Sequence, residues 1–553
     1  MLHVIGVCVD VLVETKSSVI VADVLFKMLW ILISLVCVAL TYIYVVKVQG
    51  YWKSIGVKQG NPMFFFGENF GPVARIKSFS EMVLDVYNMF PNARYSGFYQ
   101  FLTPTLVIRD PDLIKQITIK DFDHFVDHRK IIPEESDPLF GKNLFFLRGQ
   151  KWKNMRATLS PSFTSSKMKS MFTLISECAN DFVEYFKKNQ NQDIVTIEMK
   201  DTFTRFTNDV IATTAFGIKV DSLNDRTNEF YVMGKDMTNF RTLWRSMKLF
   251  GYFAFPLLFK LLKVKVFTKE VSTFFKSLIM ETIKTREEKG IVRQDMINIL
   301  MEARKGLHKY EESSAVIDTG FATVEESDIG KSKHNINLTD DDVIAQALIF
   351  FFAGFDAVSS LMCFMSYELG VNQEVQDKLR EEINQTLEKC EGKLTYEALM
   401  GMKYMDMVLS ESLRKWPNAA SIDRVCTKPY TIEPVLPDEK PIHLKKNDVL
   451  FLPFFGIHRD PKYYPNPDKF IPERFSDENK GNIKPFTYLP FGAGPRNCIG
   501  SRFAIMETKI VFFHLLASFK IVPVEKTVIP LKICKKNFNL SSENGFWLGL
   551  KRI

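Results

Sequence analysis

A long apolar run lies near the start of the chain. Residues 28–46 comprise 19 consecutive uncharged residues, close to the roughly 20 that a helix needs to cross a bilayer. Trp30 and Tyr44 stand near its two ends, where aromatic rings favour the membrane interface. Three lysines follow within a few turns (47, 53 and 58), whereas only Lys27 directly precedes it. The pattern predicts a transmembrane anchor with the rest of the chain on the cytoplasmic side.

Two other interpretations of this run stay open, a cleaved signal peptide and a buried helix of a globular domain. The run is longer than the core of a signal peptide and lacks a small-residue cleavage site. Residues 1–27 form a partly polar leader that need not belong to the mature protein, since Met28 would itself make a natural start. Residues 47–67 are predicted to be a linker, and residues 68–553 a single large domain.

Helical periodicity dominates this domain, with a smaller contribution from strands. Residues 95–108 are rich in aromatic and β-branched residues and predict early strands, whereas residues 150–300 show helical spacing. The polar residues 303–337 predict a long exposed loop. Thr339 and Asp342 then form a capping-box pattern that opens a helix reaching Leu369 and stopping at Gly370. Further helices are predicted over 371–388, 402–415 and 503–519, and short strands past 420. The fold class is therefore mainly α with a minor β portion.

Composition narrows the possible functions. The 553 residues are 46% hydrophobic and include 49 phenylalanines, enough for a substantial core. Eight scattered cysteines without a Cys-x-x-Cys pair fit neither a zinc site nor a disulfide framework. The net charge of +8 is not accompanied by basic clusters with interleaved aromatics, so we expect no nucleic-acid partner. An acidic membrane surface or an acidic protein partner explains this charge more simply.

The most informative segment is Phe-Gly-Ala-Gly-Pro-Arg-Asn-Cys-Ile-Gly at 491–500. It places Cys498 in a glycine-rich loop directly before a predicted helix, with Arg496 two residues earlier. Glycines allow a tight turn close to a flat ligand, and a helix N-terminus favours a thiolate. A thiolate facing a planar partner is what an axial haem ligand requires. A free cysteine in a glycine-rich turn is the plainer alternative.

The pattern Phe-x-x-Gly-x-Arg-x-Cys-x-Gly resembles the signature of the cytochrome P-450 superfamily, the haem-thiolate monooxygenases. The resemblance spans residues from about 50 to 553. It implies the cytochrome P-450 fold, haem b (iron protoporphyrin IX) as cofactor, Cys498 as the iron ligand and Phe491 as a cofactor contact. Stretches such as residues 159–164 are similar to insect microsomal family 9 enzymes, which belong to a clan of broad detoxifying types.

The resemblance also implies roles for charged residues elsewhere in the chain. Glu411 and Arg414, spaced i to i+3 on one helix face, together with Arg474 of a Pro-Glu-Arg-Phe motif, are implied to form a buried structural network. Guanidinium groups bind carboxylates well, and the resemblance implies partners for the haem propionates at Trp152, Arg156, Arg424, Arg496 and Arg129. Solvated arginines remain the alternative for Arg156, Arg424 and Arg129, and His128 makes the alignment of Arg129 ambiguous.

The segment 353–357 (Ala-Gly-Phe-Asp-Ala) is similar to the family's oxygen-activation motif. Gly354 lowers helix stability, which indicates a close approach or a local distortion, and Asp356 could supply protons. The family usually has a threonine where this chain has Ala357. Ser359 and Ser360 are predicted to point elsewhere on the helix and to be poor substitutes for that hydroxyl. Efficient proton delivery is thereby called into question.

The implied function is insertion of one oxygen atom of O2 into a lipophilic substrate, xenobiotic or lipid-like, by an unspecific monooxygenase of the endoplasmic reticulum membrane. No nucleotide-binding motif accompanies the domain, so electrons are expected from a separate protein. The resemblance implies that this is a membrane-bound NADPH-cytochrome reductase, with cytochrome b5 as an optional second donor. The aromatic and lysine-rich residues 240–267 are predicted to dip into the membrane or to be ordinary core helices. Two alternatives remain, a reductase-independent haem-thiolate isomerase or dehydratase and a non-catalytic haem-binding protein.

Overall fold

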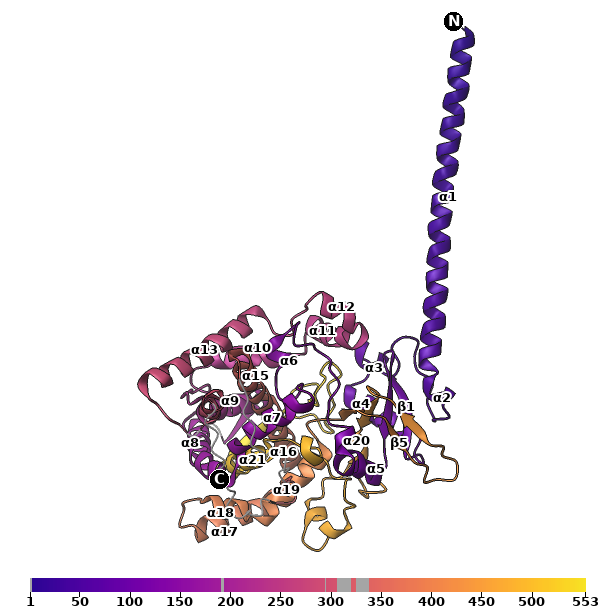
Figure 1. Cartoon of the computed structure of the whole chain (residues 1–553). Helices are drawn as coiled ribbons and strands as arrows, with labels where there is room; N and C mark the ends of the chain where they lie inside the picture. Colours follow the sequence, from indigo (N-terminus) through magenta and orange to yellow (C-terminus); the bar gives the residue numbers. More distant parts are fainter. Residues whose placement is uncertain (1, 190–192, 294, 306–319, 325–337) are drawn as a thin grey trace.

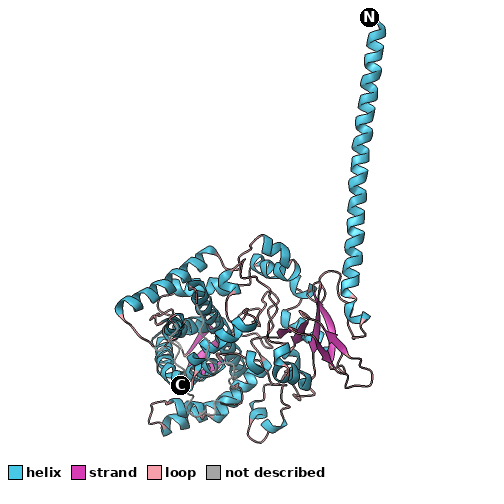
Figure 2. Cartoon of the chain, in the orientation of Figure 1, coloured by secondary structure: helices cyan, strands magenta, loops and turns pink. Residues whose placement is uncertain are grey.

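The computed structural model describes residues 2–189, 193–293, 295–305, 320–324 and 338–553. Helices predominate, and the strands are few and short (Figure 2). The α-helices are α1 Leu2–Gln49, α2 Tyr51–Ser54, α3 Phe70–Val73, α4 Phe79–Asn88, α5 Pro111–Lys115, α6 Pro138–Gly141, α7 Gly149–Leu159, α8 Ser165–Asn189, α9 Met199–Ile211, α10 Glu229–Thr238, α11 Leu243–Ala254, α12 Pro256–Leu261, α13 Lys269–Lys289, α14 Met296–Arg304, α15 Asp340–Phe352, α16 Ser359–Val371, α17 Gln373–Lys389, α18 Tyr396–Met400, α19 Lys403–Lys415, α20 Phe454–Ile457 and α21 Ser501–Ser518.

Short π and 3₁₀ segments connect or extend these helices. They are η1 Gln116–Lys120, η2 Phe122–His124, η3 Ser160–Phe163, η4 Ala212–Phe216, η6 Ala353–Val358, η7 Pro472–Phe475, η8 Lys480–Asn482 and η9 Gly494–Arg496. The predicted class, mainly α with a minor β portion, is confirmed.

Three small sheets complete the domain. The largest has the strand order β1-β2-β7-β4, in which β1 (Tyr95–Gln100) and β2 (Thr103–Ile108) form an antiparallel hairpin and β7 (Val449–Leu452) runs parallel to β2. Its outer strand β4 (Ile422–Val425) is antiparallel to β7, with Arg424 opposite Leu450. The other two sheets have the orders β3-β9-β8 (Ile194–Glu198, Trp547–Arg552, Phe519–Val522) and β5-β6 (Tyr430–Ile432, Ile442–Leu444). The early strands predicted over 95–108 are confirmed.

Helix α1 projects from the domain as a single rod (Figure 1). Its segment Phe26–Gln49 has a mean hydropathy of 2.5 with only 6% of it buried, so it is long and apolar enough to cross a membrane. The leader 1–27 is not set apart from the anchor, because residues from Leu2 onward continue the same helix. The region 47–67 is not a free linker. Trp52 in α2 is 1% exposed and packs on Gly97 of β1, where a methyl group would collide with the indole.

The long helix predicted from Thr339 is interrupted at its centre. The Thr339 and Asp342 capping box is present, but the π-helical segment η6 separates α15 from α16. The helix ends beyond Gly370, which lies inside α16 and packs close to Leu548. The combined helix has the composition of a membrane span but is 67% buried, as a core helix should be. It packs against α9 and α21, and α8 packs on both of these helices, so that the four form the centre of the domain.

Most of the loop predicted over 303–337 lies outside the described residues. Two described parts of it differ from the expected exposed loop. Ala303 and Arg304 still belong to α14, and Ala322 is buried at 2% exposure. The prediction averaged polarity over the whole segment and therefore did not detect the short apolar stretch around Ala322.

Candidate functional site

The cysteine loop is tightly fixed by the elements around it. The Cys498 backbone N–H donates to the Phe491 carbonyl over 2.8 Å, and α21 begins three residues later. Gly494 adopts a φ of +70°, and a methyl group there would lie 1.9 Å from the Thr118 carbonyl oxygen in η1. Only glycine can occupy this position without displacing η1. The loop therefore depends on a close approach of two backbones.

The Cys498 side chain is exposed although its neighbours Asn497 and Ser501 are buried. Desolvation by the protein packed around the loop raises the pKa of the Cys498 thiol, and the Gly500 N–H and Arg156 oppose this only in part. The Gly500 N–H supplies the bias toward thiolate that was expected at a helix N-terminus. Desolvation outweighs the helix terminus here. A coordinating metal ion would deprotonate the thiol outright.

Arg156 and Trp152 support the cysteine loop from α7. The two guanidinium nitrogens of Arg156 donate to the Asn497 carbonyl and to Asn497 Oδ1, each over 2.8 Å. The Arg496 guanidinium lies over the Trp152 ring, 4.2 Å from its centroid. Both residues were predicted as propionate partners from the resemblance. In this structure they hold Arg496 and Asn497, the two residues that directly precede Cys498, and the sequence did not reveal these contacts.

Arg496 and Arg424 form a buried cluster of positive charge. Arg496 donates to the carbonyls of Val126, Phe145 and Leu147, and burial together with Arg424 lowers its pKa well below the usual value. Arg424 is fully buried, and its Nε has no hydrogen-bond partner among the described residues. Burial lowers the pKa of Arg424 to about 10, against the attraction of Asp423.

Two carboxylates lie close to these buried arginines among the described residues. Asp127 is 3.6 Å from Arg496 Nη2, and Asp423 attracts the Arg424 guanidinium. Arg424 Nε nevertheless has no hydrogen-bond partner in the described part of the chain. A buried cationic group with an unsatisfied donor is costly. It fits a ligand that carries carboxylates, as the two propionates of a haem would.

Arg129 does not join this cluster through its side chain. Its guanidinium donates to Thr103 Oγ1 over 2.8 Å and to Gln100 Oε1 over 3.3 Å, on the β1–β2 hairpin. His128 lies beside Arg424 instead, with 3.5 Å between His128 Nδ1 and Arg424 Nη1. Burial lowers the pKa of His128 to about 4, so the imidazole is neutral at physiological pH. The residue that lies beside the arginine cluster is therefore His128 and not the predicted candidate Arg129.

The predicted supporting network of Glu411, Arg414 and Arg474 is present at the C-terminal end of α19. Glu411 and Arg414 are both fully buried and form a bidentate pair at 2.7 and 2.8 Å. Arg474 Nε lies 3.5 Å from Glu411 Oε1. Arg414 also donates to the His458 carbonyl over 2.9 Å. The network therefore joins α19 to η7 and α20, the segments that precede the cysteine loop.

The sequence indicated a close approach at Gly354, but the accessible face of the interrupted helix carries Ala353 and Ala357 instead. Gly354 is buried, and a methyl group there would lie 2.3 Å from Ile211 Cδ1 of α9. Gly354 thus permits a close approach, as predicted, but to another helix. Ala353 is exposed and Ala357 half-buried. Spaced i to i+4, these two alanines share a face, which leaves that face without a hydroxyl.

Asp356 is held by a lysine that no sequence motif indicated. Lys200 Nζ lies 2.9 Å from Asp356 Oδ1 and 2.8 Å from both Ser359 Oγ and Ser360 Oγ. Asn539 donates to the other carboxylate oxygen over 3.1 Å. Burial would raise the pKa of Asp356, but Lys200 and Asn539 bring it below its usual value. The two serines do not point away from Asp356, because all three side chains meet one ammonium group.

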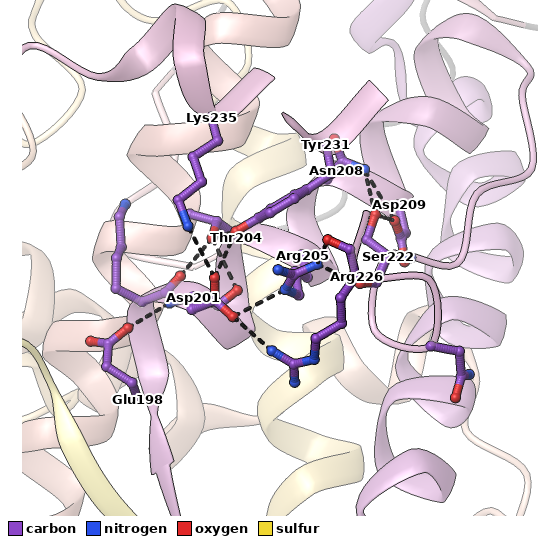
Figure 3. A network of polar contacts seen from close by, with 12 residues as sticks. Glu198, Asp201, Thr204, Arg205, Asn208, Asp209, Ser222, Arg226, Tyr231 and Lys235 are labelled. Carbon is purple, nitrogen blue, oxygen red and sulfur yellow. Dashed lines mark hydrogen bonds and ion pairs between the residues drawn. The ribbon is translucent and has the colours of Figure 1, made fainter. Parts of the chain in front are cut away.

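The lysine is positioned by the first turn of α9. Its neighbour Asp201 contacts Arg205, Arg226, Lys235 and the Tyr231 hydroxyl, which ties α9 to α10 (Figure 3). Glu198 caps the helix by accepting from the Asp201 N–H over 2.7 Å. With this turn fixed, Lys200 extends to η6 and α16. Only the folded arrangement of α9, α10 and α16 defines this contact, so a local motif could not have found it.

Comparison with known proteins agrees with the geometry. The family described as "Cytochrome P450" matches residues 82–548. The chain is 51% identical to "Cytochrome P450 9e2" of Blattella germanica, with 87% of this chain and 90% of the relative covered. It is 45% identical to "Probable cytochrome P450 9f2" of Drosophila melanogaster, with 95% and 99% covered. Identity to "Cytochrome P450 9c1" of Drosophila melanogaster is 39%, with 93% and 96% covered.

Proposed function

Because the chain belongs to the cytochrome P450 family of haem-thiolate monooxygenases and is similar to its family 9 members, we propose that it oxidises lipophilic small molecules at a membrane surface. The observation that carries the proposal is the accessible Cys498 near the buried Arg424 and Arg496, of which Arg424 has an Nε without a hydrogen-bond partner among the described residues. The substrate is a xenobiotic or an endogenous lipid-like compound that receives one oxygen atom of O2. The enzyme type is an unspecific monooxygenase.

The cofactor that these residues fit is haem b. Cys498 would supply the axial thiolate, while Arg424 and Arg496 would face the propionates with Trp152 and Arg156 supporting them. When bound, the haem supplies the activation of dioxygen. The Glu411 and Arg414 pair keeps the cysteine loop in place. Asp356 holds a carboxylate next to the alanine face of the helix, and Lys200 keeps that carboxylate ionised.

Aromatic side chains on the same helix suit a lipophilic substrate. Phe351 belongs to the core, where it packs on Phe355 and Phe275. Phe350 and Phe352 remain partly accessible, and Phe350 stacks on Phe163 with 5.5 Å between ring centroids. Apolar lining with few polar groups is typical of sites for small lipophilic ligands.

Membrane attachment is proposed through two surfaces. The first is the anchor Phe26–Gln49. The second is the apolar surface of α11 and α12, whose most exposed residues are Trp244, Leu257 and Leu261, each about four-fifths exposed. Both are on the upper side of the domain in Figure 1. Tyr252 is buried, so part of the region 240–267 is core, and the membrane contact is proposed for its exposed residues alone.

A chain of aromatic contacts runs from the anchor toward this surface. Tyr42 stacks on Phe64, and Phe65 stacks on Phe255 at the start of α12. This continuity, with the lysine bias after the anchor, supports an endoplasmic reticulum location with the domain on the cytoplasmic face. Electrons would come from NADPH through a membrane-bound reductase, with cytochrome b5 as an optional donor. The net charge of +8 suits an acidic flavin domain.

The proposal is tested by reconstitution of the full chain in lipid vesicles. We expect the reduced protein to show the carbon monoxide difference band of thiolate-ligated haem, and a lipophilic probe to be oxidised only with reductase, NADPH and O2. Oxidation or rearrangement of an organic hydroperoxide without reductase would favour the isomerase alternative. The observation in favour of that alternative is that Ala357 has no hydroxyl group. A thiolate band without any turnover would favour a haem carrier. Absence of the band would refute the assignment of Cys498.

A further inference from the structure

A fully buried lysine links the cysteine helix to α19. Lys509 lies on α21 at 0% side-chain exposure, and its ammonium group makes no hydrogen bond within the described residues. Its ion partner is Asp406 in the first turn of α19, with 3.2 Å between Nζ and Oδ1. A buried ion pair is stable only when its remaining polar atoms are satisfied. The second oxygen of Asp406 therefore matters for both helices.

A short segment between α14 and α15 supplies that partner. The Phe321 backbone N–H donates to Asp406 Oδ2 over 2.8 Å, and the Thr323 N–H closes a turn onto the Gly320 carbonyl over 3.1 Å. We call residues 320–324 the clasp. It is far from α19 in sequence, and its fixed position depends on this tertiary contact.

The ring of Phe321 completes an aromatic cluster on the same side of the domain. It packs edge-on against Phe475 of η7 at 5.0 Å and against Tyr488 at 5.2 Å between centroids. Tyr488 in turn donates its hydroxyl to the Ser410 carbonyl of α19 over 3.0 Å. Phe475 directly follows Arg474 of the supporting network. The clasp thus contacts η7 and α19, and it reaches α21 through Asp406.

Gly320 is the residue that permits this arrangement. Its φ is +103°, and a methyl group there would lie 1.8 Å from Asp406 Oδ1 and 2.4 Å from Asp406 Cγ. A side chain at residue 320 would displace either the carboxylate or the clasp. The sequence Gly-Phe-Ala therefore combines a close approach, an aromatic anchor and a buried alanine (Ala322) in three residues.

We propose that the clasp is a positioning element for the cysteine ligand, with Gly320 and Phe321 as its positioning residues. By completing the Asp406–Lys509 pair and filling the cluster around Phe475, it holds α19, α21 and η7 together and so keeps Cys498 in ligating position. This role rests on the proposed function, because it concerns retention of the thiolate ligand. It assigns a structural task to a segment that the polar pattern around it had suggested was an exposed loop.

The test compares Gly320→Ala with Gly392→Ala in the full-length holoprotein. Gly392 also has a positive φ, of +80°, but a methyl group there would meet nothing within 4 Å. Both variants therefore carry backbone strain, and only Gly320→Ala carries the collision. Two quantities are measured, hydrogen exchange of the Phe321 amide and the rate at which mild urea converts the thiolate-type carbon monoxide band to the band of haem without thiolate.

We expect the Phe321 amide to be protected in the native protein and in Gly392→Ala, and to exchange freely in Gly320→Ala. Loss of the thiolate band should be roughly tenfold faster in Gly320→Ala than in Gly392→Ala, because only Gly320→Ala adds a collision and overpacking of this kind costs about one tenfold step. Phe321→Ala should also make loss of the thiolate band faster, and it leaves the close approach of Gly320 to Asp406 intact. This second variant provides the test if Gly320→Ala does not fold.

Two results would overturn the proposal. One is an unprotected Phe321 amide in the native protein. The other is loss of its protection without faster loss of the band. The band is recorded with a chemical reductant and carbon monoxide, so failure of reductase-driven turnover does not affect the result. If the native chain shows no thiolate band, the proposed function fails, while amide exchange still decides whether the clasp is closed.

Discussion

Glu411 and Arg414 on the cysteine side of the site are both fully buried, whereas Asp356 and Lys200 on the interrupted helix are each about a fifth exposed. The first pair is closed off from solvent and joined to backbone carbonyls of neighbouring segments. The second is a solvent-accessible contact between two helices. We infer that the cysteine side is fixed during folding, and that the helix side keeps access to solvent, as a group that exchanges protons requires.

The largest effect is expected from removing the Cys498 sulfur, which is the proposed iron ligand on the cysteine side. In Cys498→Ala we expect complete loss of thiolate-type absorption, because the loop then offers no sulfur. Cys390→Ala, at a half-buried cysteine outside the site, should retain the full carbon monoxide band. A retained band in Cys498→Ala would show that the ligand lies elsewhere.

The next largest effect is expected from the buried pair. Glu411→Gln leaves the Arg414 charge buried without its partner, and we expect the free energy of unfolding to fall by about 3–5 kcal/mol. Glu397→Gln removes a solvent-exposed pair with Lys169 and should cost less than about 1 kcal/mol. Denaturant titration of both variants measures the difference. Equal losses would contradict the view that the cysteine side is the more rigid one.

His458 gives this side a pH dependence. Burial lowers the pKa of His458 to about 3, and its Nε2 accepts from the Leu489 N–H over 2.8 Å, so the folded state keeps the ring neutral. The unfolded chain takes up a proton below its ordinary pKa of 6.5. Stability is therefore complete above that value and is lost as the pH falls toward 3.

Replacement of His458 should flatten this dependence. His458→Gln is expected to reduce the slope of unfolding free energy against pH by up to about 1.4 kcal/mol per unit between pH 6.5 and 4.5. His443→Gln, at an exposed histidine of β6, should leave the slope unchanged. Denaturant midpoints at several pH values provide the measurement. An unchanged slope in His458→Gln would mean that this ring is not kept neutral.

On the helix side the predicted effects are smaller. In Lys200→Met the pKa of Asp356 should rise, because burial then acts without its main opposing charge. The pH profile of product formed per NADPH should shift to higher pH, with a stability loss of only about 1 kcal/mol. Lys200→Arg should preserve the profile. If Lys200→Met leaves the profile where it was, Asp356 does not govern proton supply.

The smallest change restores a hydroxyl to the alanine face. Ala357→Thr is expected to raise product formed per NADPH by roughly a factor of two, with a matching fall in peroxide released. Ala357→Val controls for the added volume and should not raise it. Unchanged or lower coupling in Ala357→Thr would count against a shortage of hydroxyl groups on this face.

The two sides also differ in how far the sequence predicted them. Glu411, Arg414 and Cys498 belong to short local patterns whose spacing survives folding, so their positions were predicted closely. Lys200 and Asn539 are 156 and 183 residues from Asp356, and no local pattern records such a contact. The orientation of Arg129 and the π-helical shift at 353–358 were missed for a related reason. Each is decided by packing against a neighbouring element rather than by helix periodicity.

The clasp is a second case in which the sequence pattern failed to predict packing. Average polarity over 303–337 predicts exposure, but five described residues within it include a buried alanine and an anchoring phenylalanine. A window that averages hydropathy cannot detect so short an insertion. The exposed apolar helix over 28–46, by contrast, was predicted well because its signal extends over the whole run, whereas its role as a membrane anchor stays a prediction.

The buried Arg424 near Cys498 has a consequence for biosynthesis. A chain that folds before it receives a dicarboxylate cofactor must enclose this charged group with an unsatisfied donor, which opposes closure of the domain. We therefore expect the yield of folded protein to depend on the supply of haem during synthesis. The carboxylates of the cofactor would thus neutralise buried positive charge during folding, before the cofactor takes part in any reaction.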